Sequence, residues 1–277
     1  MGHPALIPTV EESFVTQLPP RWIWRDDESY APRNRFTWFR AEFTLDVEPA
    51  EATALIAADS TAYAFVNGIP VMKGMTRFTP SRIRAERLEL GRALTPGRNV
   101  VLVLHHSWGD ITTFQRTGAQ RAGLWFSSSV VNSGTRWRWL DAEEFAAHEE
   151  QFLGLDGTPR IRYPVRWTLR EERTVPALSR PDADADWRSV SLVESAPWPP
   201  SPLPLETPQR RWVDVRPARV LGAAPAGIDA SGRGTISGNA GEEVRVVVAF
   251  ERPLHGQPFV ELESEVAGEI SLEYAEI

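Results

Sequence analysis

The chain has 277 residues, of which 30 are basic and 37 acidic, so its formal net charge is −7; 42% of the residues are hydrophobic and 24% are charged. This composition is that of a soluble globular protein of one or two domains, and it excludes disordered, collagen-like and disulfide-framework chains. The acidic balance argues against a nucleic-acid partner, no apolar run approaches the ~18 residues of a membrane span, and the absence of cysteine excludes disulfides and thiolate metal sites.

Alternation of apolar and polar residues with a period of two dominates the sequence and predicts short β-strands. Over residues 38–45, the apolar residues Phe39, Ala41 and Phe43 share one face of a predicted strand. Residues 53–58 form a second, largely apolar strand. The 23 prolines break helices and central strands alike, so they favour short strands joined by rigid loops.

A β-hairpin is predicted between residues 62–66 and 69–71, because these apolar runs flank Asn67-Gly68. Asn-Gly between two apolar runs is a strong hairpin signal, since a type I′ turn needs positive φ at both central residues. Pro70 cannot donate to a ladder, so we expect this hairpin at an edge or at a bulge of the sheet.

Further β-forming segments recur down the chain. They are predicted at residues 88–90, 99–106, 244–250, 259–266 and 270–274. Residues 181–208 are rich in Pro, Ser and Asp, and the second half of this stretch is predicted to be a semi-rigid extended linker. Many short strands about ten residues apart, with turn signals between them, are typical of antiparallel β-sandwiches.

Evidence for helices is confined to residues 141–153. Asp141 and Glu144 have the spacing of a capping box, and Phe145 and Phe152 lie seven residues apart on one helical face. The pattern predicts one short helix in this segment.

The last two predicted strands can be placed in register. A three-residue loop at 267–269 pairs Val266 with Ile270 and keeps the apolar residues on one face, whereas a two-residue loop would mismatch the faces. With about four strands, residues 206–277 fall short of a complete sandwich. The open edge of the final strand predicts self-association through this segment.

His105 and His106 are the first candidates for chemistry. Because adjacent residues of a strand point to opposite faces, the pair cannot bind one ion, and neither a metal site nor a cofactor is predicted. A triad of Ser107, His106 and either Asp59 or Asp110 lacks the Gly-x-Ser-x-Gly elbow. No carboxylate pair is predicted to flank a glycosidic bond either. We therefore expect no catalytic residue.

The tryptophans, 11 in all, have two interpretations. Trp22 and Trp24 are two residues apart, as are Trp137 and Trp139, so each pair is expected to share one face of a strand and to lie in the core. Exposed aromatic side chains, in contrast, can stack on the rings of sugars.

The loop after the predicted strand at 99–106 is the best candidate for such a sugar contact. Trp108 lies just beyond the strand end, between His106 and Asp110. An aromatic ring beside an acid offers one stacking surface and one hydrogen-bond acceptor. We therefore name His106, Trp108 and Asp110 as the candidate carbohydrate-binding residues, with weak affinity expected for a shallow rim.

A series of short motifs, taken in order, resembles one protein family. They are Trp22-Ile23-Trp24, Phe39-Arg40-Ala41-Glu42-Phe43-Thr44-Leu45, Ala57-Ala58-Asp59-Ser60, Tyr63-Ala64-Phe65-Val66-Asn67-Gly68, Leu94-Thr95-Pro96-Gly97-Arg98-Asn99-Val100 and His105-His106. The series resembles the N-terminal, galactose-binding-like β-sandwich of bacterial α-L-rhamnosidases, the glycoside hydrolases of family 78. Residues 250–276 resemble the second β-sandwich that precedes the catalytic domain in that family, although Glu251-Arg252-Pro253 replaces the usual Asp-x-Gly.

The resemblance and the strand pattern together predict an all-β fold. We expect a galactose-binding-like jelly-roll β-sandwich over residues 15–205, followed by a partial second β-sandwich over 206–277. The first sandwich carries a helix-bearing excursion near 141–153 and a Pro-rich linker near 190–208. In the family, the catalytic (α/α)₆ barrel with its acidic residues begins beyond the part that this chain matches, so no catalytic residue carries over.

The resemblance implies the N-terminal accessory region of an α-L-rhamnosidase-like glycoside hydrolase, whose reaction is hydrolysis of terminal α-L-rhamnosides. Its expected partners are a carbohydrate and a C-terminal catalytic domain absent from this chain, and the chain alone is expected to be inactive. A stand-alone carbohydrate-binding module and a purely structural sandwich that braces a partner domain remain open. The start of the chain lacks the basic and apolar segments of a secretory signal, which predicts a cytoplasmic protein.

Overall fold

The chain divides into two compact units, Met1–Gln209 and Arg210–Ile277, so the division lies four residues beyond the predicted end of the first sandwich at residue 205. The structure is a computed structural model. It describes residues 18–27, 34–47, 49, 51–75, 82–107, 121–147, 150–153, 159–162, 165–167, 171–181, 183, 186–194, 198–206, 215, 219–221, 226–228, 234–236 and 247–251.

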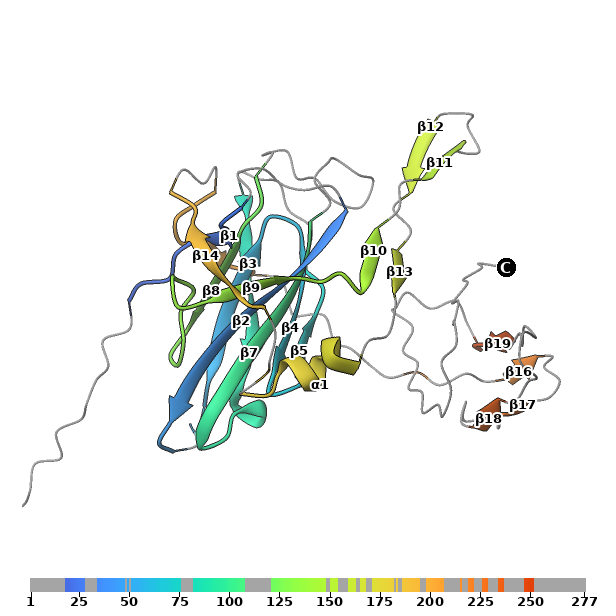
Figure 1. The fold of residues 1–277 in the computed structure, drawn as a ribbon, viewed down its shortest axis with the longest axis horizontal. Coiled ribbons are helices and arrows are strands. Elements are labelled where there is room, and N and C mark those ends of the chain that lie inside the picture. Colours follow the sequence, from blue (N-terminus) through green and yellow to red (C-terminus); the bar gives the residue numbers. More distant parts are fainter. Residues whose placement is uncertain are drawn as a thin grey trace, which may run out of the picture. The chain divides into compact units, whose positions relative to one another are not determined.

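The first unit is built on an 11-stranded sheet in the order β15-β6-β3-β8-β1-β14-β9-β2-β7-β4-β5 (Figure 1). Its strands are β1 (Ile23–Arg25), β2 (Arg35–Leu45), β3 (Thr53–Ala58), β4 (Thr61–Val66), β5 (Ile69–Lys73), β6 (Arg84–Glu89), β7 (Gly97–Ser107), β8 (Leu124–Ser128), β9 (Arg138–Asp141), β14 (Arg188–Leu192) and β15 (Leu203–Pro204). Short 3₁₀ turns, at Gly91–Ala93 and Glu171–Arg173, and one α-helix, α1 (Val175–Leu178), interrupt them.

The sheet folds over into two layers that enclose the main core. Strands β6, β3 and β8 lead through β1 and β14 to the layer of β9, β2, β7, β4 and β5. The largest buried cluster draws on both layers, including Ile56 of β3, Phe126 of β8, Phe39 of β2 and Val103 of β7. These side chains point inward because alternate residues of a strand lie on the same face. The prediction of an all-β fold is confirmed.

The outer face of each layer is also covered. Trp38 and Leu102 pack in a second cluster with Leu178 of α1. Trp125 packs in a third cluster with Trp22 and Trp198. These covers explain why β2 and β7 are apolar on both faces over much of their length.

All four tryptophans of the two predicted pairs are buried, but only one pair lies in a single hydrophobic cluster. Trp137 and Trp139 belong to the main cluster. Trp24 belongs to it as well, whereas Trp22 lies in the outer cluster with Trp198. The expectation of a shared face for Trp22 and Trp24 is wrong because β1 begins only at Ile23, so the strand period does not extend back to residue 22.

The predicted hairpin is confirmed in detail. Strands β4 and β5 pair across Asn67 and Gly68, whose φ angles are 50° and 83°. The ladder shifts register between Ala64 and Phe65, opposite Pro70, and β5 is the last strand of the sheet. Pro70 therefore lies on an edge strand and next to a bulge, the two positions predicted for it.

The predicted helix over residues 141–153 is wrong. Asp141 ends β9, and the segment continues as β10 (Phe145–Ala147) and β11 (Glu150–Leu153), which pair with β13 (Val165–Trp167) and β12 (Pro159–Arg162). The capping-box residues have other partners, because Asp141 binds arginine side chains and Glu144 accepts a hydrogen bond from the indole of Trp38 at 2.5 Å. Tertiary contacts override the local helical pattern here.

The segment predicted to be an extended linker is bound to the sandwich over residues 198–205, where β15 is its one described strand beyond β14. Trp198 is buried, and the indole N–H of Trp22 donates to the carbonyl of Pro199 at 2.8 Å. Strand β15 pairs in parallel with β6, and the N–H of Leu205 donates to the carbonyl of Ala85 at 2.8 Å. The segment therefore closes one outer face of the first unit.

In the second unit, β16 (Arg219–Leu221) pairs with β19 (Val247–Ala249), and β17 (Ala226–Ile228) pairs with β18 (Gly234–Ile236). The strand predicted at 244–250 is found over 247–249. The strands predicted at 259–266 and 270–274, with the loop at 267–269, lie outside the described residues, and self-association through them stays a prediction. Within the described ranges, no helix has the length and apolar character needed to cross a membrane.

Candidate functional site

Of the three candidate carbohydrate-binding residues, the structure describes His106; Trp108 and Asp110 lie outside the described residues. The His106 ring is 5% exposed, stacks on Phe36 with 3.9 Å between centroids, and has Nε2 2.8 Å from Oδ1 of Asn34. Burial, with a smaller effect from His105, lowers the pKa of His106 to about 3. His106 is thus neutral and enclosed at neutral pH, and its role in a sugar site stays a prediction.

His105 faces the opposite side of β7, as predicted. Its Nε2 lies 2.9 Å from Oδ1 of Asp59, and its ring meets the ring of Trp24 edge-on at 4.8 Å. The same Asp59 oxygen accepts the backbone N–H of Gly123 at 2.8 Å. Since Asp59 is bound to buried His105 and not to His106, the version of the triad that uses Asp59 does not form, whereas Asp110 lies outside the described residues.

Several buried polar atoms around His105 have no hydrogen-bond partner in the part of the chain that the structure describes. They are His105 Nδ1, Asp59 Oδ2, Ser107 Oγ, Thr37 Oγ1 and Trp24 Nε1. Thr37 lies opposite His105 in the β2–β7 ladder, so this polar group occupies the inner face at one end of the sandwich. No three His, Asp or Glu side chains among the described residues are arranged to hold a metal ion.

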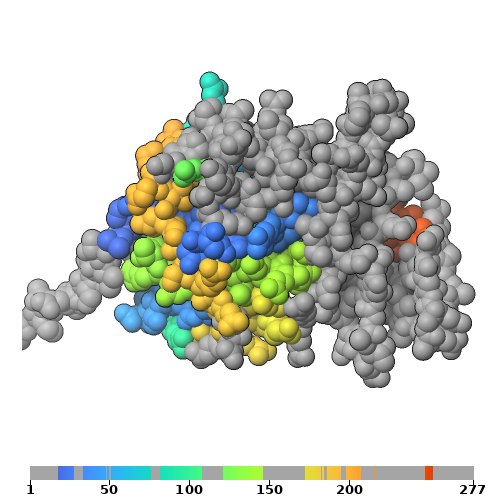
Figure 2. All heavy atoms as spheres, turned by 45° about the horizontal axis from the view of Figure 1, so that its top comes forward, coloured from blue at the N-terminus to red at the C-terminus, as the bar shows by residue number. Residues whose placement is uncertain are grey.

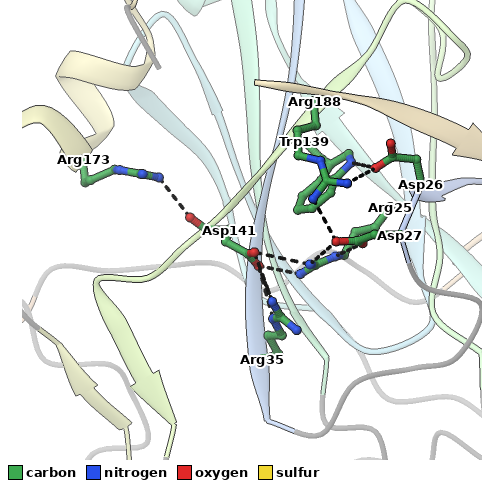
Figure 3. A network of polar contacts seen from close by, with 8 residues as sticks. All are labelled: Arg25, Asp26, Asp27, Arg35, Trp139, Asp141, Arg173 and Arg188. Atoms are coloured by element: carbon green, nitrogen blue, oxygen red, sulfur yellow. Dashed lines mark hydrogen bonds and ion pairs between the residues drawn. The ribbon is translucent and has the colours of Figure 1, made fainter. Parts of the chain in front are cut away.

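A network of charged side chains is centred on Asp141 at the end of β9 (Figure 3). Arg25 of β1 lies 2.5 Å from Oδ1 of Asp141, and Arg35 of β2 binds both carboxylate oxygens at 3.2 and 3.0 Å. Arg173 donates to the backbone carbonyl of Asp141 at 3.0 Å. Asp141 thereby joins β1, β2 and the segment that leads into α1.

Trp139 forms the centre of the adjoining half of the network (Figure 3). The guanidinium groups of Arg25 and Arg188 lie over its ring, 4.1 and 4.4 Å from the centroid. Its indole N–H donates to Oδ1 of Asp26 at 2.8 Å, and Arg188 binds Asp26 and Asp27 at 3.2 and 3.0 Å. Asp26 and Asp27 are therefore held in place from two sides.

Asp27 is also bound by Arg25, at 3.0 and 3.1 Å. The hydrogen bonds from Arg25, with the charges of Arg25 and Arg188, lower the pKa of Asp27 in spite of its partial burial. The side chain of Arg25 is 1% exposed, so this buried cation depends on Asp27 and Asp141.

A groove of about 480 Å³ opens beside this network, between the turn that follows β1 and strand β14. It is lined by Trp24, Arg25, Asp26, Asp27, Arg121, Ala122 and residues 191–194. Figure 2 shows the two segments, blue for the first and orange for the second, side by side at the surface, in agreement with the β1–β14 pairing. The volume lies within the ~300–1,000 Å³ typical of ligand sites.

A smaller groove of about 280 Å³ lies between β5 and β6, lined in part by Ile69, Pro70, Arg87 and Glu89. None of the candidate site residues predicted from the sequence lines either groove. The residues of the larger groove come from three separate segments, and only the charged run Arg25-Asp26-Asp27 directly after an apolar strand could have drawn attention to it.

No protein-family model and no curated protein matches this chain. Among solved structures, a family 78 rhamnosidase of Bacillus sp. GL1 matches with a TM-score of 0.59 and 22% identity, over 75% of this chain and 22% of that one. The α-L-rhamnosidase of Aspergillus terreus matches with a TM-score of 0.50 and 17% identity, over 74% of this chain and 24% of that one. A lectin from Pleurotus ostreatus matches with a TM-score of 0.42 and 17% identity, over 69% of this chain and 48% of that one.

The chain spans about a quarter of the length of the rhamnosidases that it matches. At this level of identity the similarity shows the fold alone. The predicted resemblance to a β-sandwich region of α-L-rhamnosidases, and with it the galactose-binding-like fold, is confirmed in that sense.

Proposed function

We propose that the first unit is a non-catalytic accessory β-sandwich of an α-L-rhamnosidase-like glycoside hydrolase. The reaction of the whole enzyme would be the hydrolysis of terminal α-L-rhamnosides, carried out by a catalytic domain outside the matched region. The observation that carries the proposal is the match to the Bacillus sp. GL1 rhamnosidase, which extends over 75% of this chain but only 22% of that enzyme. An accessory role fits a region that is a minor part of a much longer hydrolase.

The carboxylates of the larger groove support a role without catalysis. A glycosidase needs one carboxylic acid with a raised pKa as the proton donor. Here hydrogen bonds from Arg25 lower the pKa of Asp27. Asp26 is bound by Arg188, and Glu194 by Arg21 at 2.9 Å. All three groove carboxylates are thus paired with guanidinium groups, and none of them is placed in the apolar surroundings that a proton donor of this kind needs.

The two alternatives each have one observation in their favour. A stand-alone carbohydrate-binding module is favoured by the larger groove, with its several hydrogen-bonding side chains. A purely structural sandwich is favoured by the tryptophans: seven of the eight whose exposure is described are buried, namely Trp22, Trp24, Trp38, Trp125, Trp137, Trp139 and Trp198. Buried indoles stabilise the core and leave no broad aromatic platform for a sugar on the described surface.

A domain exchange tests the accessory role. Residues 18–206 would replace the matching region of the Bacillus sp. GL1 rhamnosidase, and hydrolysis of an aryl α-L-rhamnoside would be compared with that of a variant from which the region is deleted. We expect the exchanged enzyme to be folded and active and the deletion variant to lose activity. A folded exchange variant as inactive as the deletion would overturn the proposal.

The isolated chain provides the second measurement. We expect no turnover of the aryl rhamnoside by the pure protein. Turnover that disappears when one carboxylate, such as Asp26, is changed to its amide would show that the chain is itself catalytic.

A further inference from the structure

We infer that the groove between the turn after β1 and strand β14 binds a neutral sugar through hydrogen bonds to its hydroxyl groups. The inference rests on the proposed function, which supplies the class of ligand. It places the site at residues other than His106, Trp108 and Asp110. The groove offers about 480 Å³, enough for a small-molecule ligand.

The lining supplies both acceptors and donors. The side chains of Asp26 and Asp27 are 39% and 30% exposed, so their carboxylates keep free acceptor positions beside their bonds within the network. Arg121 is half-buried, and Ser191 is exposed. A sugar hydroxyl both donates and accepts, so neighbouring hydroxyls can donate to a carboxylate while accepting from a guanidinium group.

The acceptors are held in position before any ligand arrives. Trp139 and Arg188 bind Asp26, and Arg25 and Arg188 bind Asp27. Side chains that are already ordered lose little entropy on binding, so more of the hydrogen-bond energy is available for affinity. The lowered pKa of Asp27 also keeps this acceptor ionised into the acidic range.

The charge balance selects for a neutral ligand. Each groove carboxylate has a guanidinium partner, since Arg188 and Arg25 bind Asp26 and Asp27 and Arg21 binds Glu194. Arg121 adds a cation without such a partner in the described structure, so the lining holds two arginines and three carboxylates in all. A ligand of either charge would meet groups of its own sign there and gain little net attraction. The aromatic residue of the lining, Trp24, is 3% exposed and offers little stacking surface, so we expect binding in the millimolar range.

Titration of the full chain with methyl α-L-rhamnoside and, separately, methyl β-D-galactoside tests the inference, with affinities from protein NMR. We expect saturable binding of at least one of them, with shifts at 24–27 and 191–194. Asp26→Asn and Arg121→Ala should each weaken it about tenfold, as expected for a charge-assisted hydrogen bond. Glu89→Gln and Arg87→Ala, matched changes of exposed residues at the smaller groove, should leave the affinity unchanged.

Two measures guard the test against misfolded variants. Asp26→Asn removes a charge that Arg188 binds, so its thermal unfolding is measured alongside. Arg121→Ala and Ser191→Ala remove side chains that have no hydrogen bond or ion pair in the described structure, so these variants should fold normally.

The outcomes separate the two proposals. Affinity that is unchanged in all the groove variants overturns the groove site and leaves the accessory function standing. Failure of the wild-type chain to bind either glycoside overturns the groove site as well. The domain exchange, which measures hydrolysis and not binding by the isolated chain, decides the accessory function in either case.

Discussion

The indole of Trp198 occupies the space where a side chain at Gly123 would lie: a Cβ built on Gly123 would stand 2.6 Å from Cζ3 of Trp198. The same Cβ would lie 3.1 Å from the ring of Trp22. Gly123 is thus required for the Pro-rich segment to lie against the sandwich.

Gly123→Ala should lower the free energy of unfolding by about 1–3 kcal/mol, because the added methyl group overpacks two indole rings. Denaturant unfolding followed by tryptophan fluorescence measures the change. The matched control is Gly134→Ala, since a Cβ there meets nothing within 4 Å and φ is not in the left-handed region. Equal stability of the two variants would contradict the packing described here.

Trp198→Ala should lower the free energy of unfolding by about 3 kcal/mol, because it leaves a cavity against Trp22 and Trp125. It should also release residues 198–205 from the sandwich. Limited proteolysis measures this release as faster cleavage in the Pro-rich segment than in the wild-type chain. A cleavage rate equal to that of the wild type would show that β15 holds the segment without the indole.

Asp141→Asn should lower the free energy of unfolding by about 2 kcal/mol, because Arg25 is buried and would keep Asp27 as its remaining carboxylate partner. Urea unfolding at neutral pH measures the loss. Asp46→Asn, a change of an exposed aspartate, serves as the control and should be nearly neutral. A loss no larger than that of the control would show that Arg25 does not need the charge of Asp141.

His106 should make the protein less stable as the pH falls below neutral. Its pKa in the folded chain is about 3, against about 6.5 when unfolded, so between these values the unfolded chain binds a proton that the folded chain does not. Stability therefore falls with decreasing pH, by about 1.4 kcal/mol per unit or roughly 2 kcal/mol from pH 6.5 to 5.

The variant His106→Gln removes this titration and should flatten the pH dependence over the same interval. Urea unfolding of both proteins at pH 6.5 and pH 5 measures the difference. The comparison uses the change with pH within each protein, so a loss of packing in the variant does not affect it. Parallel pH profiles would show that His106 is protonated in the folded protein.

Strand β19 should exchange its amide hydrogens faster than β7. Its Val247 and Val248 are 45% and 42% exposed, whereas the apolar residues of β7 are buried. Hydrogen exchange read by mass spectrometry, repeated over a dilution series, checks both the protection and the self-association predicted for 244–276. Protection in a strict monomer equal to that of residues 37–105 would contradict both.

The elements that could be predicted from the sequence are those whose signal is local. Period-two alternation located β2, an apolar run and a β-forming run located β3 and β7, and Asn67-Gly68 located the β4–β5 hairpin with its turn type. Such signals depend only on the backbone preferences of adjacent residues and on which face is buried.

The predictions that were wrong or missing all depend on contacts between residues far apart in the chain, which a single sequence does not reveal. Asp141 and Glu144 have helix-capping spacing, yet they bind Arg25 and Trp38, more than 100 residues away along the chain. The Pro-rich segment has the composition of a linker, yet its Trp198 packs against Gly123 of the sandwich. The larger groove could not be predicted for the same reason, because its lining forms only when β1 and β14 pair.

The strands at the two ends of the 11-stranded sheet have a consequence for how the protein behaves among its own copies. At one end, β5 carries Pro70 beside a bulge of the same strand; at the other, β15 is two residues long and includes Pro204. A long, flat terminal strand would offer free N–H and C=O groups to a neighbouring molecule. Proline removes a donor and a bulge twists the ladder, so neither end of the first unit is a good template for fibril-like growth.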